Sequence, residues 1–209
     1  MPTLISARMG GLALMLGGPV WLWGLAGLDE TIPPYSHAGG HLLLALAGLL
    51  SLVGLLGTRA RIAGRAGRPG AVGLALACVG AVLVLVGNSA EGLFEAELGW
   101  GAFSVGMLAL LIGLAVFGFA ALRTGALPRW GATPLVIVPP VLLLIGVGGT
   151  ALVTALGVPE PAEGSSLEVL YGLVMGTVYA ACWVLLGYSV WSYRRGERLT
   201  APTGGRQSS

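Results

Sequence analysis

Charge is scarce in this sequence, and one charged residue type is missing altogether. Charged residues make up 10% of the chain, lysine is absent, and all eleven basic residues are arginines. Because soluble domains carry about a quarter charged residues, this composition excludes an ordinary soluble protein. Two cysteines are too few for a disulfide-stabilised scaffold, and a formal net charge of +2 gives no basis for binding nucleic acid.

Long apolar stretches fill the space between the charges. Six of them reach the roughly 20 residues that a helix needs to cross a bilayer. They are apolar on every face, which favours helices over the alternating strands of a membrane barrel. We therefore predict an all-α integral membrane bundle of six transmembrane helices, formed by a single domain at residues 1–199 and followed by a disordered cytoplasmic tail at 200–209. The expected spans are about 9–28, 38–58, 70–90, 100–122, 133–156 and 169–193.

The first apolar stretch has a second interpretation, because one arginine before an apolar run can also begin a secretory signal. The run is long for a signal core, and Gly27-Leu28-Asp29 does not fit a small-x-small cleavage site. We expect it to be a membrane span.

The arginines predict the orientation of the bundle. With six spans, all eleven fall on one side of the membrane, in the loops after the second, fourth and sixth spans and before the first. They are Arg8, Arg59, Arg61, Arg65, Arg68, Arg123, Arg129, Arg194, Arg195, Arg198 and Arg206. Cytoplasmic loops are enriched in arginine and lysine. We expect a multi-pass protein of the plasma membrane with both termini in the cytoplasm.

The 36 glycines are not scattered at random. Three spans carry a glycine at every seventh position, which returns close to the same helix face and leaves room for another backbone. These rows are Gly10, Gly17 and Gly24; Gly73, Gly80 and Gly87; and Gly99, Gly106 and Gly113. They favour packing within the chain, although they could also join copies of this chain or another membrane protein. Membrane lipids are the other expected partner.

Tryptophans cluster near the predicted ends of the spans, where an amphipathic ring suits the lipid headgroups. This group comprises Trp21, Trp23, Trp100, Trp130 and Trp191. Trp183 lies deeper in its span, and we expect it to be packed between helices.

Both histidines lie on the side away from the arginines. His37 and His41 are four residues apart and would share one helix face if the second span begins early. Asn88, Glu91 and Glu95 extend the third span toward the same side. Imidazoles and carboxylates from adjacent helices could bind Zn²⁺, so His37, His41, Glu91 and Glu95 form a candidate metal site. A solvated rim of acids and histidines explains the same residues more simply, and a pH-sensing pair is a further alternative. Gly39 and Gly40 could break the turn between the histidines.

The turn after the fourth span carries the one resemblance to known proteins. Arg123-Thr-Gly-Ala-Leu-Pro-Arg-Trp130 resembles a cytoplasmic Gly-x-Leu-Pro-Arg-Trp turn of uncharacterised bacterial multispanning membrane proteins. The resemblance implies a bacterial inner-membrane protein and implies no active site. Gly125 is the residue expected to end the fourth span.

Three functions remain open from the sequence. No Asp, Glu, Arg or His lies near the middle of a span, which argues against catalysis or charge-coupled transport inside the membrane. The favoured hypothesis is therefore a protein without evident catalytic machinery, either an accessory subunit or a binder of a small apolar or lipid-like ligand. A transporter, kinked at Pro139 and Pro140 and with a water-filled path, is the second. A metal-dependent hydrolase at the histidine site is the third.

Overall fold

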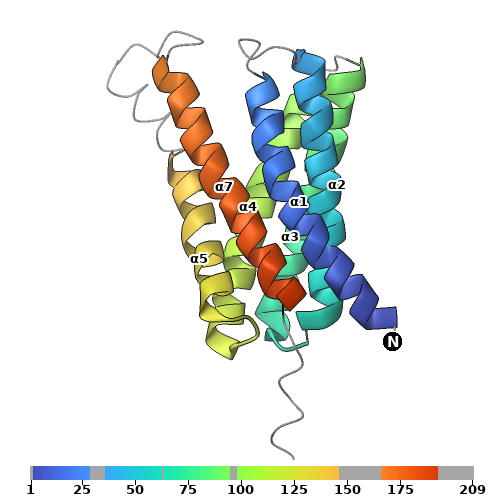
Figure 1. Ribbon diagram of the computed structural model, residues 1–209, viewed down its shortest axis with the longest axis vertical. Coiled ribbons are helices and arrows are strands. Elements are labelled where there is room, and N and C mark those ends of the chain that lie inside the picture. Colours follow the sequence, from blue (N-terminus) through green and yellow to red (C-terminus); the bar gives the residue numbers. More distant parts are fainter. Residues whose placement is uncertain (1, 29–35, 63, 95–97, 146–165, 193–209) are drawn as a thin grey trace, which may run out of the picture.

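The structure is a computed structural model that describes residues 2–28, 36–62, 64–94, 98–145 and 166–192 (Figure 1). The described residues form six helices and no strands, which confirms the predicted all-α class. These helices are α1 (Pro2–Leu28), α2 (His37–Ile62), α3 (Gly67–Phe94), α4 (Leu98–Thr124), α5 (Arg129–Leu143) and α7 (Ser166–Ser192).

Five of the six helices are long and apolar enough to cross a membrane: α1, α2, α3, α4 and α7. The sixth, α5, has 15 residues and is shorter than the roughly 20 that a span requires. It covers the first part of the predicted fifth span, 133–156, and continues through Pro134, Pro139 and Pro140. The rest of that span and the predicted tail at 200–209 lie outside the described residues, so the structure supports five of the six predicted crossings.

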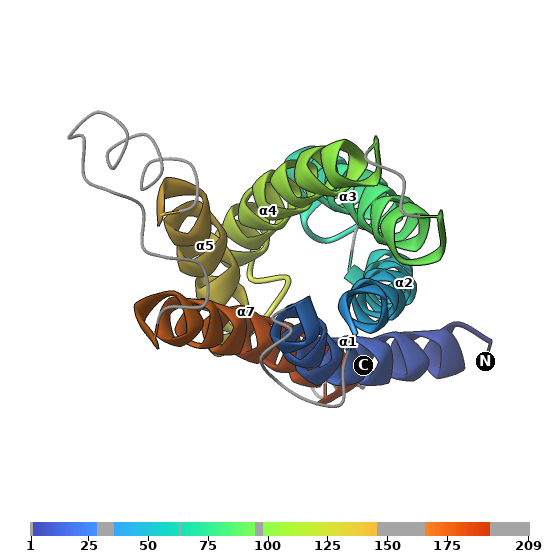
Figure 2. The same cartoon turned by 90° about the horizontal axis from the view of Figure 1, so that it is seen from above.

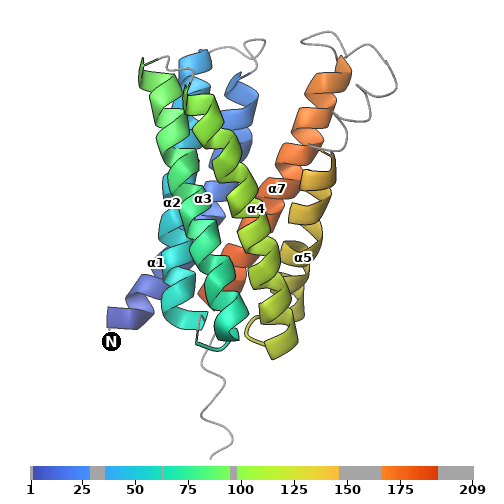
Figure 3. The ribbon, with the colours of Figure 1, turned by 180° about the vertical axis from the view of Figure 1, so that it is seen from behind.

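The helices are arranged as a closed ring. Each one packs against the next described helix in the sequence, and α7 packs against α1 to close the circle. Figure 2 shows the ring from above, and Figure 3 shows from behind how α4 links the α1–α2–α3 side to the α5–α7 side. The helix ends that carry the described arginines lie together at one end of the bundle (Figure 1). We call it the arginine end, and the histidines lie at the opposite end.

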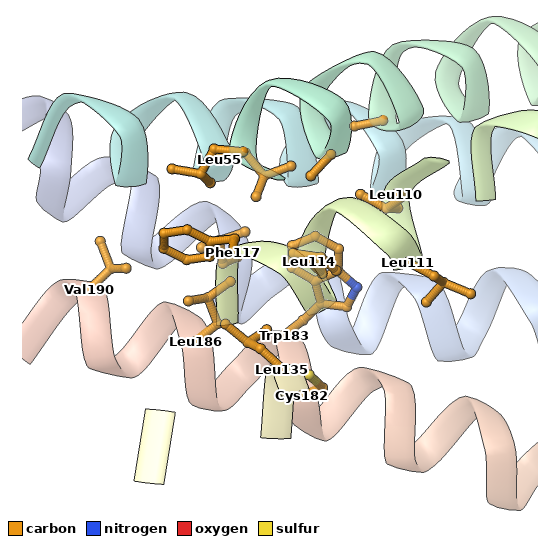
Figure 4. Packing of buried hydrophobic residues seen from close by; sticks show 14 of the residues in the cluster. Leu55, Leu110, Leu111, Leu114, Phe117, Leu135, Cys182, Trp183, Leu186 and Val190 are labelled. Carbon is orange, nitrogen blue, oxygen red and sulfur yellow. The ribbon is translucent and has the colours of Figure 1, made fainter. Parts of the chain in front are cut away.

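Large apolar side chains from opposite helices fill the middle of the ring. Figure 4 shows side chains of α7 and α5 reaching toward α4, with α2 contributing from the other side. The fully or almost fully buried members of this cluster include Leu55, Leu110, Leu114, Phe117, Leu135, Trp183 and Leu186. The interior at this level is therefore packed with hydrocarbon and indole.

The glycine rows of α3 and α4 lie against each other. A Cβ added at Gly80 would lie 2.6 Å from the carbonyl oxygen of Gly106, and one added at Gly87 would lie 2.6 Å from that of Gly99. No side chain fits at these distances, so the two backbones touch directly. The rows pack helices of the same chain, as favoured from the sequence, whereas pairing between subunits stays a prediction.

Helix α1 carries two such rows. Gly10, Gly17 and Gly24 face α2, while Gly11 and Gly18 lie against the backbone of Gly187 and Ala180 in α7. The second row does not follow the seventh-residue pattern beyond one step, so it was not predicted from the sequence. It is what allows the first and last helices to meet.

The structure corrects one prediction about the tryptophans. Trp21 is 1% exposed and its Nε1 donates a hydrogen bond to Ser51 Oγ, 3.3 Å away, so its assignment as a headgroup anchor was wrong. Trp21 lies on the α1 face between Gly17 and Gly24, and that face packs on α2. Helix face therefore decides its burial, and nearness to the helix end does not. Trp183 is buried as predicted, and the four other predicted anchors are exposed.

Candidate histidine site

The start of α2 is fixed by a local cap that holds the first histidine in place. Ser36 Oγ accepts the backbone N–H of Gly39 at 3.2 Å, and the Ser36 carbonyl accepts that of Gly40 at 3.0 Å. This is the arrangement of a serine N-cap, which satisfies amide donors that the first helical turn leaves free. His37 is therefore the first residue of α2, and His41 lies one turn further along the same face.

Gly40 does not break the turn, because it has a packing role. A Cβ at this position would lie 2.6 Å from the carbonyl carbon of Gly27 at the end of α1. The glycine lets α1 approach α2 backbone to backbone, so the residue that looked like a helix breaker belongs to the helix contact. The early start of the span, on which the histidine pairing depended, is confirmed.

A chain of hydrogen bonds runs inward from the surface through the two histidines. His37 Nε2 lies 3.1 Å from His41 Nε2, and His41 Nδ1 lies 3.0 Å from Asn88 Oδ1 on α3. The two imidazole rings meet edge to face, with centroids 4.7 Å apart. His37 is exposed, whereas His41 and Asn88 are 4% and 1% exposed. The site therefore begins at the surface and ends inside the bundle.

The asparagine determines where the proton of His41 lies. Asn88 Nδ2 donates to the carbonyl of Val84 at 2.9 Å, which turns Oδ1 toward His41. Because a carbonyl oxygen only accepts hydrogen bonds, Nδ1 of His41 must carry hydrogen. In the neutral ring Nε2 then presents a lone pair, and the Nε2–H of His37 donates to it.

The close approach of α3 to this turn of α2 also depends on a glycine. A Cβ at Gly92 would lie 3.1 Å from His41 Cβ and 3.2 Å from the Ala38 carbonyl oxygen. Gly92 is one turn beyond Asn88 on α3, so the pair forms the surface against which His41 packs. The sequence placed Asn88 at the same end as the histidines but did not link it to them. An amide inside the apolar run of α3 was the signal that could have identified it.

The structure brings together part of the predicted metal site. His37 and His41 are in contact, as expected. Glu91 is half-buried on α3, with its side chain next to Gly99 of α4, and Glu95 lies outside the described residues. Among the residues that the structure describes, no three His, Cys, Asp or Glu side chains lie close enough together to hold a metal ion. The described carboxylate therefore does not complete the predicted set of ligands.

A second polar feature lies deeper, in an aromatic cluster formed by α1 and α7. The ring of Tyr179 packs edge to face on Trp21, with centroids 5.2 Å apart, and on Trp183, with centroids 5.9 Å apart. All three side chains are at most 3% exposed. Tyr179 OH and Trp183 Nε1 are buried without a hydrogen-bond partner within the described structure.

No protein-family model, no curated protein and no solved structure matches this chain. The fold itself defines the class, because a ring of helices with five long apolar members is built for a lipid environment. The chain is a multi-span helical membrane protein. The more particular assignment depends on its two polar features.

Proposed function

We propose that this chain is a six-span protein of a bacterial inner membrane, with its arginine end and both termini in the cytoplasm. It has no catalysis of its own and binds a lipid-like ligand, apolar along most of its length and with one polar group, between its helices. The ligand contacts the Trp21–Tyr179–Trp183 cluster.

The observation that carries this proposal is the pair of unsatisfied polar atoms in the cluster. A buried donor without a partner costs about 1–3 kcal/mol, and buried polar atoms in folded proteins nearly always have partners. Tyr179 OH and Trp183 Nε1 lie on the same helix, one turn apart, among apolar side chains. A carbonyl, ether or hydroxyl oxygen of a ligand would accept from both, and its apolar part would suit the surrounding Leu and Ala side chains.

The alternatives have less support from the described residues. A water-filled transport path would need polar side chains along it, such as Asn88, Ser104, Thr150 or Tyr179. The side chain of Asn88 is already hydrogen-bonded to His41 and to the Val84 carbonyl. Ser104 is exposed on the outside of α4, and Thr150 lies outside the described residues. The hydrolase hypothesis needs a third ligand that the described residues do not supply. A pure accessory subunit would leave the two polar atoms unexplained.

The test is to purify the chain in a mild detergent and analyse what remains bound by native mass spectrometry. We expect about one amphipathic molecule per chain in the wild type. In the double variant Tyr179→Phe with Trp183→Phe, two hydrogen bonds of about 1 kcal/mol each are lost, so retention should fall at least roughly tenfold.

Matched control substitutions are available on the exposed face of the same helix. Tyr188→Phe with Trp191→Phe makes the same chemical changes at two exposed residues and should retain the ligand like the wild type. If the wild type carries no small molecule, or if both double variants lose it equally, the aromatic cluster is not a ligand site. Helical content measured by circular dichroism checks that both variants fold.

A further inference from the structure

The histidine chain has a geometry that a hydrogen bond alone does not require. The Nε2 atoms of His37 and His41 point toward each other on one face of α2, and the hydrogen bond from His41 Nδ1 to Asn88 Oδ1 fixes the orientation of the His41 ring. We propose that His37 and His41 form the protein part of a binding site for a single divalent transition-metal ion, with Asn88 as a positioning residue. This site is separate from the ligand proposed for the aromatic cluster.

The spacing of the two nitrogen atoms supports this. A Zn²⁺ ion lies about 2.0–2.1 Å from each histidine nitrogen, so two ligands at a tetrahedral angle lie about 3.3 Å apart. The two Nε2 atoms lie 3.1 Å apart. The separation of the two nitrogen atoms therefore has to change by only a few tenths of an ångström, and the exposed His37 ring has to turn so that its lone pair points at the ion.

The protonation states also fit. His41 already presents a lone pair on Nε2, since Nδ1–H donates to Asn88 Oδ1. Histidines that bind metals usually donate their other N–H to a carbonyl or carboxylate, and this partner fixes the ring. The neutral His37 only has to move its hydrogen from Nε2 to Nδ1, where water can accept it.

The ligand type selects the kind of ion. Imidazole nitrogen suits Zn²⁺, Cu²⁺ and Ni²⁺, whereas Mg²⁺ and Ca²⁺ prefer oxygen ligands. The described arginines all lie at the other end of the bundle, so none of them repels a cation here. Water reaches His37, and it would fill the remaining coordination positions because the described residues supply no third side chain.

The test measures bound Zn²⁺ by equilibrium dialysis and elemental analysis of the full-length chain in detergent. The wild type should bind one ion per chain. His37→Ala should lower the affinity at least tenfold, and it is a safe variant because His37 is exposed. His41→Ala should have the same effect. Asn88→Leu should weaken binding by about 10–100-fold, as expected when the partner of a metal-bound histidine is lost.

A spectroscopic readout separates metal ligation from a purely structural role. With Cu²⁺ in place of Zn²⁺, the electron paramagnetic resonance spectrum should show two coupled nitrogen atoms in the wild type and one in His37→Ala. Unchanged Zn²⁺ binding in His37→Ala would overturn the proposal, as would the absence of bound ion in the wild type. An equal loss in Glu91→Gln would replace the two-histidine site with one that uses the carboxylate.

Discussion

At the scale of single residues, several buried polar side chains of this bundle hydrogen-bond to a backbone carbonyl of their own helix. Thr58 Oγ1 donates to the Gly54 carbonyl at 2.9 Å, and Ser189 Oγ donates to that of Leu186 at 2.7 Å, both within one helical turn. Such bonds make a hydroxyl tolerable in an apolar helix. Within the described part of the chain, the bonds from Trp21 to Ser51 and between His41 and Asn88 join two helices, so the loss of either should destabilise the bundle.

Removing the Ser51 hydroxyl gives a test of this idea. Ser51→Ala leaves the buried Nε1–H of Trp21 without its acceptor, which should cost about 1–3 kcal/mol and lower the midpoint of thermal unfolding in detergent. Ser104→Ala, an identical change on the exposed outer face of α4, should leave the midpoint nearly unchanged. Equal midpoints for the two variants would show that the Trp21–Ser51 bond contributes little.

At the scale of helices, the contact of α3 with α4 depends on the absence of side chains. Lipid removes the hydrophobic drive between helices, so close backbone packing has to supply the attraction. Gly80 lies in the middle of this contact, against Gly106 and Leu110. A single methyl group at this position would have to displace backbone.

Two glycine substitutions separate packing from intrinsic helix propensity. Gly80→Ala should destabilise the protein by about 1–3 kcal/mol, because overpacking forces the helices apart. Gly101→Ala on α4 meets nothing within 4 Å and should be neutral or stabilising by up to about 1 kcal/mol, since alanine favours helix. Thermal unfolding of both variants in one detergent measures the difference, and a stable Gly80→Ala protein would contradict the packing.

The glycine rows show how far sequence could go at this scale. Helix positions followed from the gaps between charges, and Gly125, with φ of +64°, ends α4 as expected. The seventh-residue spacing predicted which faces are smooth. It could not predict which helices those faces join, because a smooth face fits any other smooth face. The burial of Trp21 and the role of Gly40 were missed for the same reason.

The histidine site, too, could be predicted from the sequence only in part. Four-residue spacing placed His37 and His41 on one face, since helical geometry alone decides this. The link from His41 to Asn88 spans 47 residues of sequence and depends on how α2 sits against α3. No local pattern encodes that offset, so the sequence did not link Asn88 to His41, and the predicted site included Glu91 and Glu95 instead.

At the scale of the whole molecule, the ring has two chemically different ends. The described arginines gather at one end, and the paired histidines lie at the other. In the topology that we propose from the positive-inside rule, the first end lies in the cytoplasm. The histidine site then faces the outside, where ions reach it without crossing the membrane.

Cysteine labelling tests this orientation. In a background with Cys78→Ala and Cys182→Ala, Ser36→Cys should react with a membrane-impermeant maleimide added to intact cells. Gly64→Cys, exposed in the turn between α2 and α3, should react only after the membrane is permeabilised. The reverse pattern would invert the proposed topology and place the histidines in the cytoplasm.

The contact between α1 and α7 has a consequence for how the protein is made. The other five extensive helix–helix contacts join described helices that follow one another in the chain, so they can form as each helix leaves the ribosome. Gly11 and Gly18 of α1, however, are covered only after α7 has been synthesised. During synthesis this face of α1 therefore stays uncovered until α7 has been made. Until then it can pack against a helix of another membrane protein.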